Sequence, residues 1–201
     1  MMGRSELVSG IVDAVSRHPL LSGGTWSVLD LGAEDLISVV GEALAPYPSL
    51  RSRRSEILIA LEEARANIAR HAHDPDGGVC LVRHSAPDRT ALDFLFADRG
   101  EGLKISGRLP PYGAETIGQE FEFRHTFDGV VTCRVCGADT VEIRFHRYPD
   151  DHKVLDLENL PVGGMGLSIM SKVMDRLVYL THIGPANLLW MRLCVPGETG
   201  T

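Results

Sequence analysis

A glutamate, an asparagine and a histidine recur at four-residue intervals in the alanine-rich stretch LEEARANIARHAH, residues 61–73. On an α-helix, at about 100° per residue, Glu63, Asn67 and His71 fall together at the edge of the apolar stripe. A carboxylate and an amide oxygen one turn apart can share a hydrated divalent cation such as Mg²⁺. The carboxylate can also accept a proton from an attacking hydroxyl. The alternative is a surface glutamate, a hydrogen-bonded asparagine and a histidine that interacts with the helix C-terminus.

A second candidate is FADRGEG at residues 96–102, which follows directly after an apolar strand-like run. Asp98 stands at the strand end, where it could accept a hydrogen bond from an exocyclic amine. Gly100 and Gly102 allow the backbone to turn tightly and to approach a flat ligand. A plain strand-exit turn is the alternative interpretation of the same residues.

A third candidate is VGGMGLSIM at residues 162–170, where Gly163, Gly164 and Gly166 precede a helical pattern. Backbone N–H groups at a helix N-terminus form an anion site, and glycines allow phosphates to come close. The stretch lacks the Gly-Lys-Ser/Thr of a Walker A motif. A flexible entry to a helix is the alternative.

Taken in this order, the three motifs resemble the GHKL (Bergerat) ATP-binding superfamily, and within it the bacterial anti-sigma-factor serine/threonine kinases. EARANIARH at 63–71 is similar to the N-box of that family, and DRGEG at 98–102 to its first glycine box. GMGLSIM at 164–170, continuing into MDRLVY at 174–179, is similar to the second glycine box and the segment after it. The resemblance covers about residues 25–104 and 160–195.

The resemblance implies that the chain binds ATP and Mg²⁺, with Glu63 as general base and Asn67 as metal ligand. Asp98 would bind the adenine amino group, whereas Asp175 would have a structural role. Glycines would shape the adenine pocket and receive the phosphates: Gly100, Gly102, Gly164 and Gly166.

Two features depart from the family pattern. The segment 103–162 between the glycine boxes is about three times the length that a lid over the nucleotide needs, and it contains an apparent hairpin. Relatives often have a cationic side chain just before the second glycine box, but here residues 160–162 read LPV. A contact to the terminal phosphate would have to come from elsewhere, with Lys104, Lys153 and Lys172 as candidates.

The resemblance implies an anti-sigma regulatory factor that phosphorylates a serine or threonine of an antagonist protein and sequesters a sigma factor in the alternative state. Family members are commonly dimers. One rival is a binding module of the same fold that acts without catalysis through its expanded lid. A second is the ATP-binding domain of a two-component histidine kinase, which is disfavoured because no phospho-acceptor helical hairpin precedes residue 25.

The elements that must position these motifs alternate between helices and hairpins. This order predicts an α/β (α+β) two-layer sandwich: a mixed, largely antiparallel sheet with helices on one face and a hairpin inserted in the lid region. We expect an N-terminal helical extension over 1–24 and an ATP-binding domain over 25–201, with an insert at about 104–160. The expected helices are 6–17, one within 32–48, 53–73 and 166–180; the expected strands are 25–31, 79–85, 90–98, a hairpin at 129–147, and 186–195.

The bulk composition is that of an ordinary globular protein. The formal charge is −7 at pH 7, which argues against direct nucleic-acid binding and against an anionic membrane surface. No apolar run approaches the ~20 residues of a membrane span, and the first residues do not read as a signal peptide. We therefore expect a cytoplasmic protein.

The cysteines suggest one further rival. Cys80 and Cys194 lie in apolar strand-like runs and are expected to be buried. Cys133 and Cys136 have half of a zinc-knuckle spacing, and a second half is not evident. Three interpretations of this pair remain: a metal-dependent module, a redox pair, or ordinary hairpin residues. On a strand, Cys133 and Cys136 would point to the same side only at a bulge or turn.

Overall fold

The computed structural model describes residues 4–22, 24–29, 36–71, 79–84, 90–149 and 165–195. The longest of the described helices, α3, has 18 residues, and no described helix is both long and apolar enough to cross a membrane. The elements in chain order are α1 (Arg4–Arg17), β1 (Ser27–Leu29), α2 (Leu36–Leu44), the 3₁₀ helix η1 (Pro48–Arg53), α3 (Arg54–His71), β2 (Val79–His84), β3 (Ala91–Asp98), β4 (Glu120–Thr126), β5 (Gly129–Gly137), β6 (Thr140–Arg147), α4 (Gly166–Val173), β7 (Arg176–Ile183) and β8 (Ala186–Cys194).

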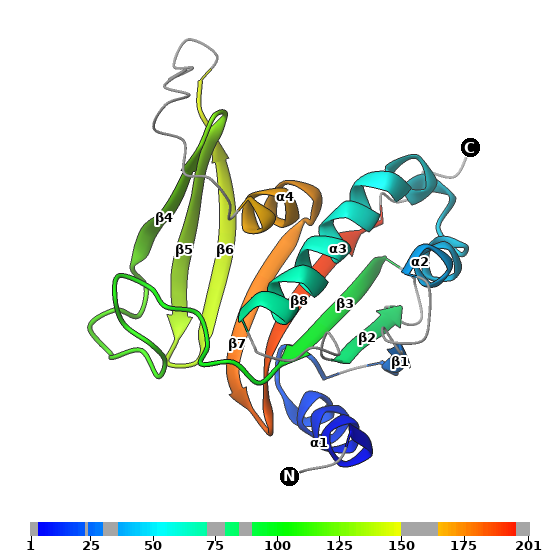
Figure 1. The fold of residues 1–201 in the computed structure, drawn as a ribbon, viewed down its shortest axis with the longest axis horizontal. Helices are drawn as coiled ribbons and strands as arrows, with labels where there is room; N and C mark the ends of the chain where they lie inside the picture. The colour runs from blue at the N-terminus through cyan, green and yellow to red at the C-terminus, as the bar shows by residue number, and fades with distance from the viewer. Residues whose placement is uncertain are drawn as a thin grey trace.

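The strands form one eight-stranded sheet in the order β1-β2-β3-β8-β7-β6-β5-β4 (Figure 1). Every pairing between described strands is antiparallel. The inserted hairpin continues this sheet, because β6 pairs with β7 from Thr140↔Leu180 to Ile143↔Leu177. The insert also adds β4, which is not among the expected strands. Its exposed side chains include the charged Glu120 and Glu122, as is common on an edge strand.

The helices α2, α3 and α4 cover one face of the sheet, as the sandwich prediction requires. Their buried side chains share a core with alternate residues of β2, β3 and β8, such as Cys80, Phe94 and Leu189. The expected core stripe of α3 is buried: Ile57, Leu61, Ala64 and Ile68. The α+β two-layer sandwich is therefore confirmed.

The opposite face of the sheet is partly covered by α1, so helices are not confined to one side. Leu7, Ile11 and Val15 pack there against strand residues such as Leu95 and Trp190. The amphipathic pattern of α1 predicts a buried face, but it does not indicate which side of the sheet that face meets.

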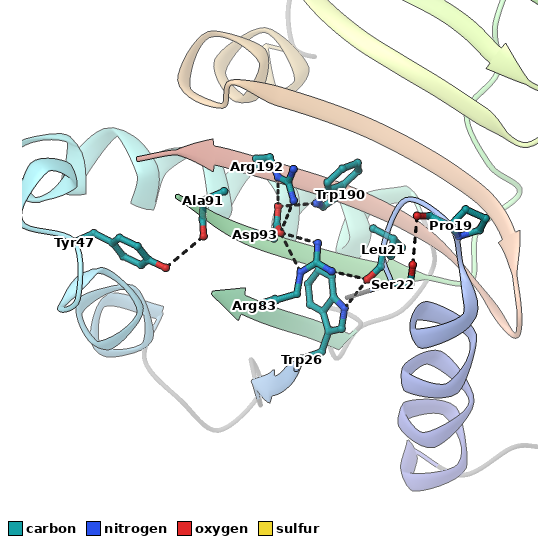
Figure 2. A network of polar contacts seen from close by, with 10 residues as sticks. All are labelled: Pro19, Leu21, Ser22, Trp26, Tyr47, Arg83, Ala91, Asp93, Trp190 and Arg192. Carbon is teal, nitrogen blue, oxygen red and sulfur yellow. Dashed lines mark hydrogen bonds and ion pairs between the residues drawn. The ribbon is translucent and has the colours of Figure 1, made fainter. Parts of the chain in front are cut away.

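A buried polar network anchors the chain just after α1 (Figure 2). The guanidinium of Arg83 donates to the carbonyl oxygen of Leu21, and the indole N–H of Trp26 donates to the same oxygen at 3.3 Å. Arg83 also lies over the Trp26 ring, 4.4 Å from its centroid, and binds Asp93 on β3. The N-terminal extension is thereby tied to the central strands by hydrogen bonds as well as by apolar packing.

The predicted helix over 166–180 is wrong beyond Val173. Met174 is already extended, with φ −90° and ψ 138°, and β7 follows as a strand. Successive side chains of β7 face opposite sides of the sheet, and both sides are buried: Leu177 packs in the core with α3, and Val178 in the core with α1. The helical spacing of Met174 and Leu177 with the preceding residues is coincidental.

Candidate functional site

The helix α3 places Glu63 and Asn67 at the edge of its buried stripe, as the spacing predicts. Both residues are intermediate in exposure, and the Glu63 side chain is 31% exposed. A carboxylate in this position is reachable from solvent while its backbone is fixed by a helix packed on the sheet. His71 is the last residue of α3, and its side chain lies outside the described residues.

The first residue of α4 lies directly against this pair. A Cβ atom built on Gly166 would be 2.7 Å from Oε2 of Glu63 and 3.1 Å from Nδ2 of Asn67. Any larger residue would therefore fill the space beside the carboxylate, so glycine keeps the helix N-terminus and the two polar side chains together. Gly163 and Gly164 lie outside the described residues.

The helix α4 is held at its C-terminal end by two contacts. Arg53 of η1 donates to the carbonyl of Val173, the last residue of α4. Asp175, just beyond, accepts a hydrogen bond from the backbone N–H of Cys194 at 2.7 Å, which is consistent with its expected structural role. These contacts fix the C-terminal end of α4 relative to η1 and β8.

Lys172, a candidate phosphate ligand, instead binds the insert. Its Nζ lies 2.8 Å from Oδ1 of Asp128 in the β4–β5 turn and 4.3 Å from the centroid of the Phe145 ring. Burial alone would raise the pKa of Asp128, but hydrogen bonds from Lys172 and Thr126 hold it below its ordinary value. Of the other two candidates, Lys104 is exposed on the loop after β3, and Lys153 lies outside the described residues.

Asp98 ends β3 on the same face as α3 and accepts three hydrogen bonds from described residues. The backbone N–H of Gly100 donates to Oδ1 at 2.7 Å, and the Asn187 amide donates to the same oxygen at 3.2 Å. The Tyr179 hydroxyl donates to Oδ2 at 3.1 Å. An ionised carboxylate has about four acceptor positions. These donors therefore leave room for one more, and Asp98 remains 9% exposed.

The glycine turn after Asp98 is fixed by close contacts. Asn187 also donates to the carbonyl of Gly100 at 2.7 Å, so one amide side chain holds both ends of the turn. Gly102 has φ +96°, a conformation that side chains rarely adopt, and a Cβ there would lie 2.9 Å from Cγ of Pro110. The predicted roles of Gly100 and Gly102 in shaping a turn are compatible with this geometry.

Tyr179 and Asn187 are site residues that the sequence reasoning missed. The helix predicted over 166–180 includes Tyr179, although the β-branched and aromatic residues of RLVYLTHI are a signal that favours a strand. Burial, and then the charge of Asp98 and the hydrogen bond to it, raise the pKa of Tyr179, so the hydroxyl stays protonated and donates. Asn187 carries no local signal, because its partners lie on another strand.

The two cysteines of the insert do not face one another. Cys133 is buried in the core under α4, where burial above all raises the pKa of its thiol to about 12. Cys136 is exposed at the register shift of β5. Cys80 is buried as expected, whereas Cys194 is exposed at the end of β8, so its predicted burial is wrong. Among the described side chains, no group of three or more His, Cys, Asp or Glu is arranged to hold a metal ion.

The motif residues thus form two groups on the helical face of the sheet: Glu63 and Asn67 against Gly166, and Asp98 with the turn that follows it. A family model described as the histidine kinase-like ATPase domain matches residues 32–193. No curated protein and no solved structure matches the chain. The family model covers both groups and most of the sequence, and the chain belongs to the histidine kinase-like ATPase domain family, whose domain binds ATP.

Proposed function

We propose that this ATP-binding domain is a Mg²⁺-dependent protein serine/threonine kinase of the anti-sigma regulatory type. It would phosphorylate a serine or threonine of an antagonist protein and sequester a sigma factor when that antagonist is phosphorylated. The observation that carries the proposal is the contact of Gly166 with Glu63 and Asn67, since it joins a proton acceptor, a metal-ligand oxygen and a helix N-terminus.

The residues present fit a metal–nucleotide complex. The space beside Gly166 is one that a Cβ would fill, and it is bordered by a carboxylate and an amide oxygen, the ligand types that Mg²⁺ prefers. Asp98 keeps an acceptor position beyond the three donors that described residues supply. Bound ATP would supply the phosphoryl group, and its Mg²⁺ would neutralise part of the negative charge of the phosphates.

Each side chain then has a defined task. Glu63 would accept the proton of the attacking hydroxyl, and Asn67 would present its Oδ1 to the metal. Asp98 would orient the adenine ring by accepting a hydrogen bond from its amino group at Oδ2. The backbone N–H groups at the start of α4 would face the phosphates.

A second function is favoured by one specific observation. The insert forms three strands of the sheet, and its β4–β5 turn engages Lys172, a cation that could otherwise serve the phosphates. A non-catalytic nucleotide-binding or protein-binding module that acts through these strands is therefore the alternative. It would keep ATP binding at Asp98 but would not need Glu63 as a base.

The experiment that separates the two combines calorimetry with phosphoryl transfer. ATP is titrated into the wild type and into Asn67→Ala, with and without Mg²⁺. Transfer of labelled phosphate from ATP to a small antagonist protein is then compared for the wild type, Glu63→Ala and Glu62→Ala. Glu62 is a matched control, because it pairs with Arg65, away from Gly166.

The kinase proposal expects Mg²⁺-dependent binding that Asn67→Ala weakens, and transfer that falls by at least about a hundredfold in Glu63→Ala alone, the scale of a lost general base. ATP binding without transfer, unchanged by Glu63→Ala, would establish the binding module instead. No binding at millimolar ATP would refute both.

A further inference from the structure

Arg70 on α3 reaches back along the helix to Glu63 and Asn67. Its Nη2 lies 3.4 Å from Oε2 of Glu63 and 3.3 Å from Oδ1 of Asn67. Its Nε donates to the carbonyl of Ala66 at 3.1 Å, which fixes the direction of the guanidinium. Arg70 can reach both residues because it lies seven positions after Glu63 and three after Asn67, and such positions share one side of a helix.

The guanidinium therefore faces the two oxygens that a divalent cation would use. The Arg70 side chain is 51% exposed, and its contacts to the two oxygens are long for charge-assisted hydrogen bonds. Such a contact is weak and exchangeable, since exposed ion pairs contribute little and are screened by salt. Arg70 can leave these oxygens without unfolding the helix.

Other cations near this end of the domain have different partners. Lys172 binds Asp128, and Arg53 donates to the carbonyl of Val173. Of the described cationic side chains, Arg70 is the one with hydrogen bonds to Glu63 and Asn67. The positive charge that residues 160–162 lack is thus present on α3, one turn beyond Asn67.

We propose that Arg70 is the resident counter-ion of Glu63 and Asn67: it orients their oxygens in the nucleotide-free protein, competes with a divalent cation for them, and contributes its charge to the polyphosphate. The inference rests on the proposed function, because it assumes that a metal–nucleotide complex enters this site. Arg70 is a positioning residue, and no chemical step passes through it.

The proposal has a signature of two opposite effects. Replacing Arg70 by glutamine removes a positive charge next to the metal ligands, so the affinity for Mn²⁺ alone should rise. The same change removes a positive charge beside the polyphosphate, so the affinity for ATP in the presence of EDTA should fall. Each change should be roughly fivefold at low ionic strength, the effect of one unit charge about 4 Å away in a water-like medium. Both should shrink in 0.5 M salt.

Arg65→Gln is the matched control. Arg65 lies on the same helix with similar exposure, but it pairs with Glu62 at 2.8 Å. It removes the same charge from the protein as Arg70→Gln does. Neither affinity should change by more than about 1.5-fold in this variant, because the screened charge is distant from the site. Mn²⁺ binding is measured by electron paramagnetic resonance, ATP binding by calorimetry, and folding of each variant by thermal unfolding.

The outcomes separate this inference from the function on which it rests. Opposite changes in Arg70→Gln but not in Arg65→Gln support it. Equal changes in the two variants, changes of the same sign, or no change in Arg70→Gln overturn it even when wild-type ATP binding is intact. If the wild type binds no ATP with or without metal, the proposed function fails, and the Mn²⁺ measurement still decides whether Arg70 competes for the two oxygens. Absence of Mn²⁺ binding in every variant overturns the inference.

Discussion

Asp93 and Asp98 lie on the same strand, β3, but they face opposite sides of the sheet and are held by different kinds of donor. Asp93 is fully buried on the side of α1 and accepts five hydrogen bonds, from Arg83, Arg192 and the Trp190 indole. Asp98 faces α3 and accepts three from described residues, all of them neutral donors. Asp93 is neutralised by arginines and has no free acceptor position, whereas Asp98 keeps an acceptor position.

The difference separates a structural carboxylate from one that is available to a ligand. Two arginines neutralise Asp93, and together with the Trp190 indole they occupy all of its acceptor positions, so a ligand could bind it only by displacing an existing partner. Neutral donors orient Asp98 without neutralising it, and its position at a strand end leaves it partly accessible. A buried acidic residue is thus a binding candidate when its partners are neutral and incomplete, not merely because it is buried.

The largest expected effect comes from breaking the saturated site. Asp93→Asn should lower the free energy of unfolding by about 3–5 kcal/mol, because it leaves two arginines without their buried counter-charge. Denaturation by urea, followed by fluorescence of Trp190 and Trp26, measures the change. A loss below about 1 kcal/mol would show that the arginines find other partners and that the network is not what holds the extension to the sheet.

The same network predicts a specific response to acid. Burial alone would raise the pKa of Asp93, but hydrogen bonds from Arg192 and Arg83, and their charges, hold it below the ordinary value. A lowered pKa stabilises the folded state above the ordinary aspartate pKa of about 3.9, and this stabilisation is lost as pH falls through the folded pKa. The stability gap between wild type and Asp93→Asn should therefore be constant from pH 7 to about pH 5 and narrow below about pH 4. A stability gap that widened in acid would contradict a lowered pKa of Asp93 in the folded state.

At Asp98, we expect a smaller effect that falls on ATP binding instead of on stability. Asp98→Asn should weaken ATP binding about 10- to 100-fold, the equivalent of one charge-assisted hydrogen bond, and change the unfolding free energy by less than about 1 kcal/mol. Calorimetric titration with ATP and urea denaturation test the two halves. Asp93→Asn, measured at a temperature where it remains folded, is the control and should bind ATP nearly as the wild type does. If both variants lose binding equally, Asp98 acts through stability and the comparison fails.

The sequence predicted the positions of Glu63 and Asn67 on α3 well, because the signals that place them are local. The four-residue spacing fixes Glu63 and Asn67 relative to the core stripe, and this geometry holds in α3. The sandwich was also predictable, since short apolar runs rich in strand-forming residues mark β2, β3 and β8. A helix-like spacing concealed β7, which is buried on both faces and so lacks the polar alternation that would mark a strand.

The remaining parts of the site depend on contacts between segments far apart in the sequence. Asn187 holds Asp98 across nearly ninety positions, a pairing set by the register of β3 and β8, in which Asp98 and Asn187 are direct partners. That register cannot be read from either strand alone. The placement of α1 has the same origin, because its apolar face fits either side of a sheet until Arg83 and Asp93 select one.

The smallest expected effect concerns the neutral donor to Oδ2 of Asp98. Tyr179→Phe should lower ATP affinity by about fivefold or less and the unfolding free energy by about 1 kcal/mol, the contribution of one hydrogen bond. The Tyr179 hydroxyl orients Asp98 but is not required for its charge. The loss of ATP affinity in Tyr179→Phe must therefore be smaller than the loss in Asp98→Asn. Tyr148→Phe is the matched control, since its hydroxyl contacts His125 in the insert, 2.6 Å away. It should leave ATP binding unchanged. A loss in Tyr179→Phe as large as that in Asp98→Asn would mean that the hydroxyl itself binds the nucleotide, and the distinction between orienting donors and ligand-binding acceptor would have to be redrawn at Tyr179.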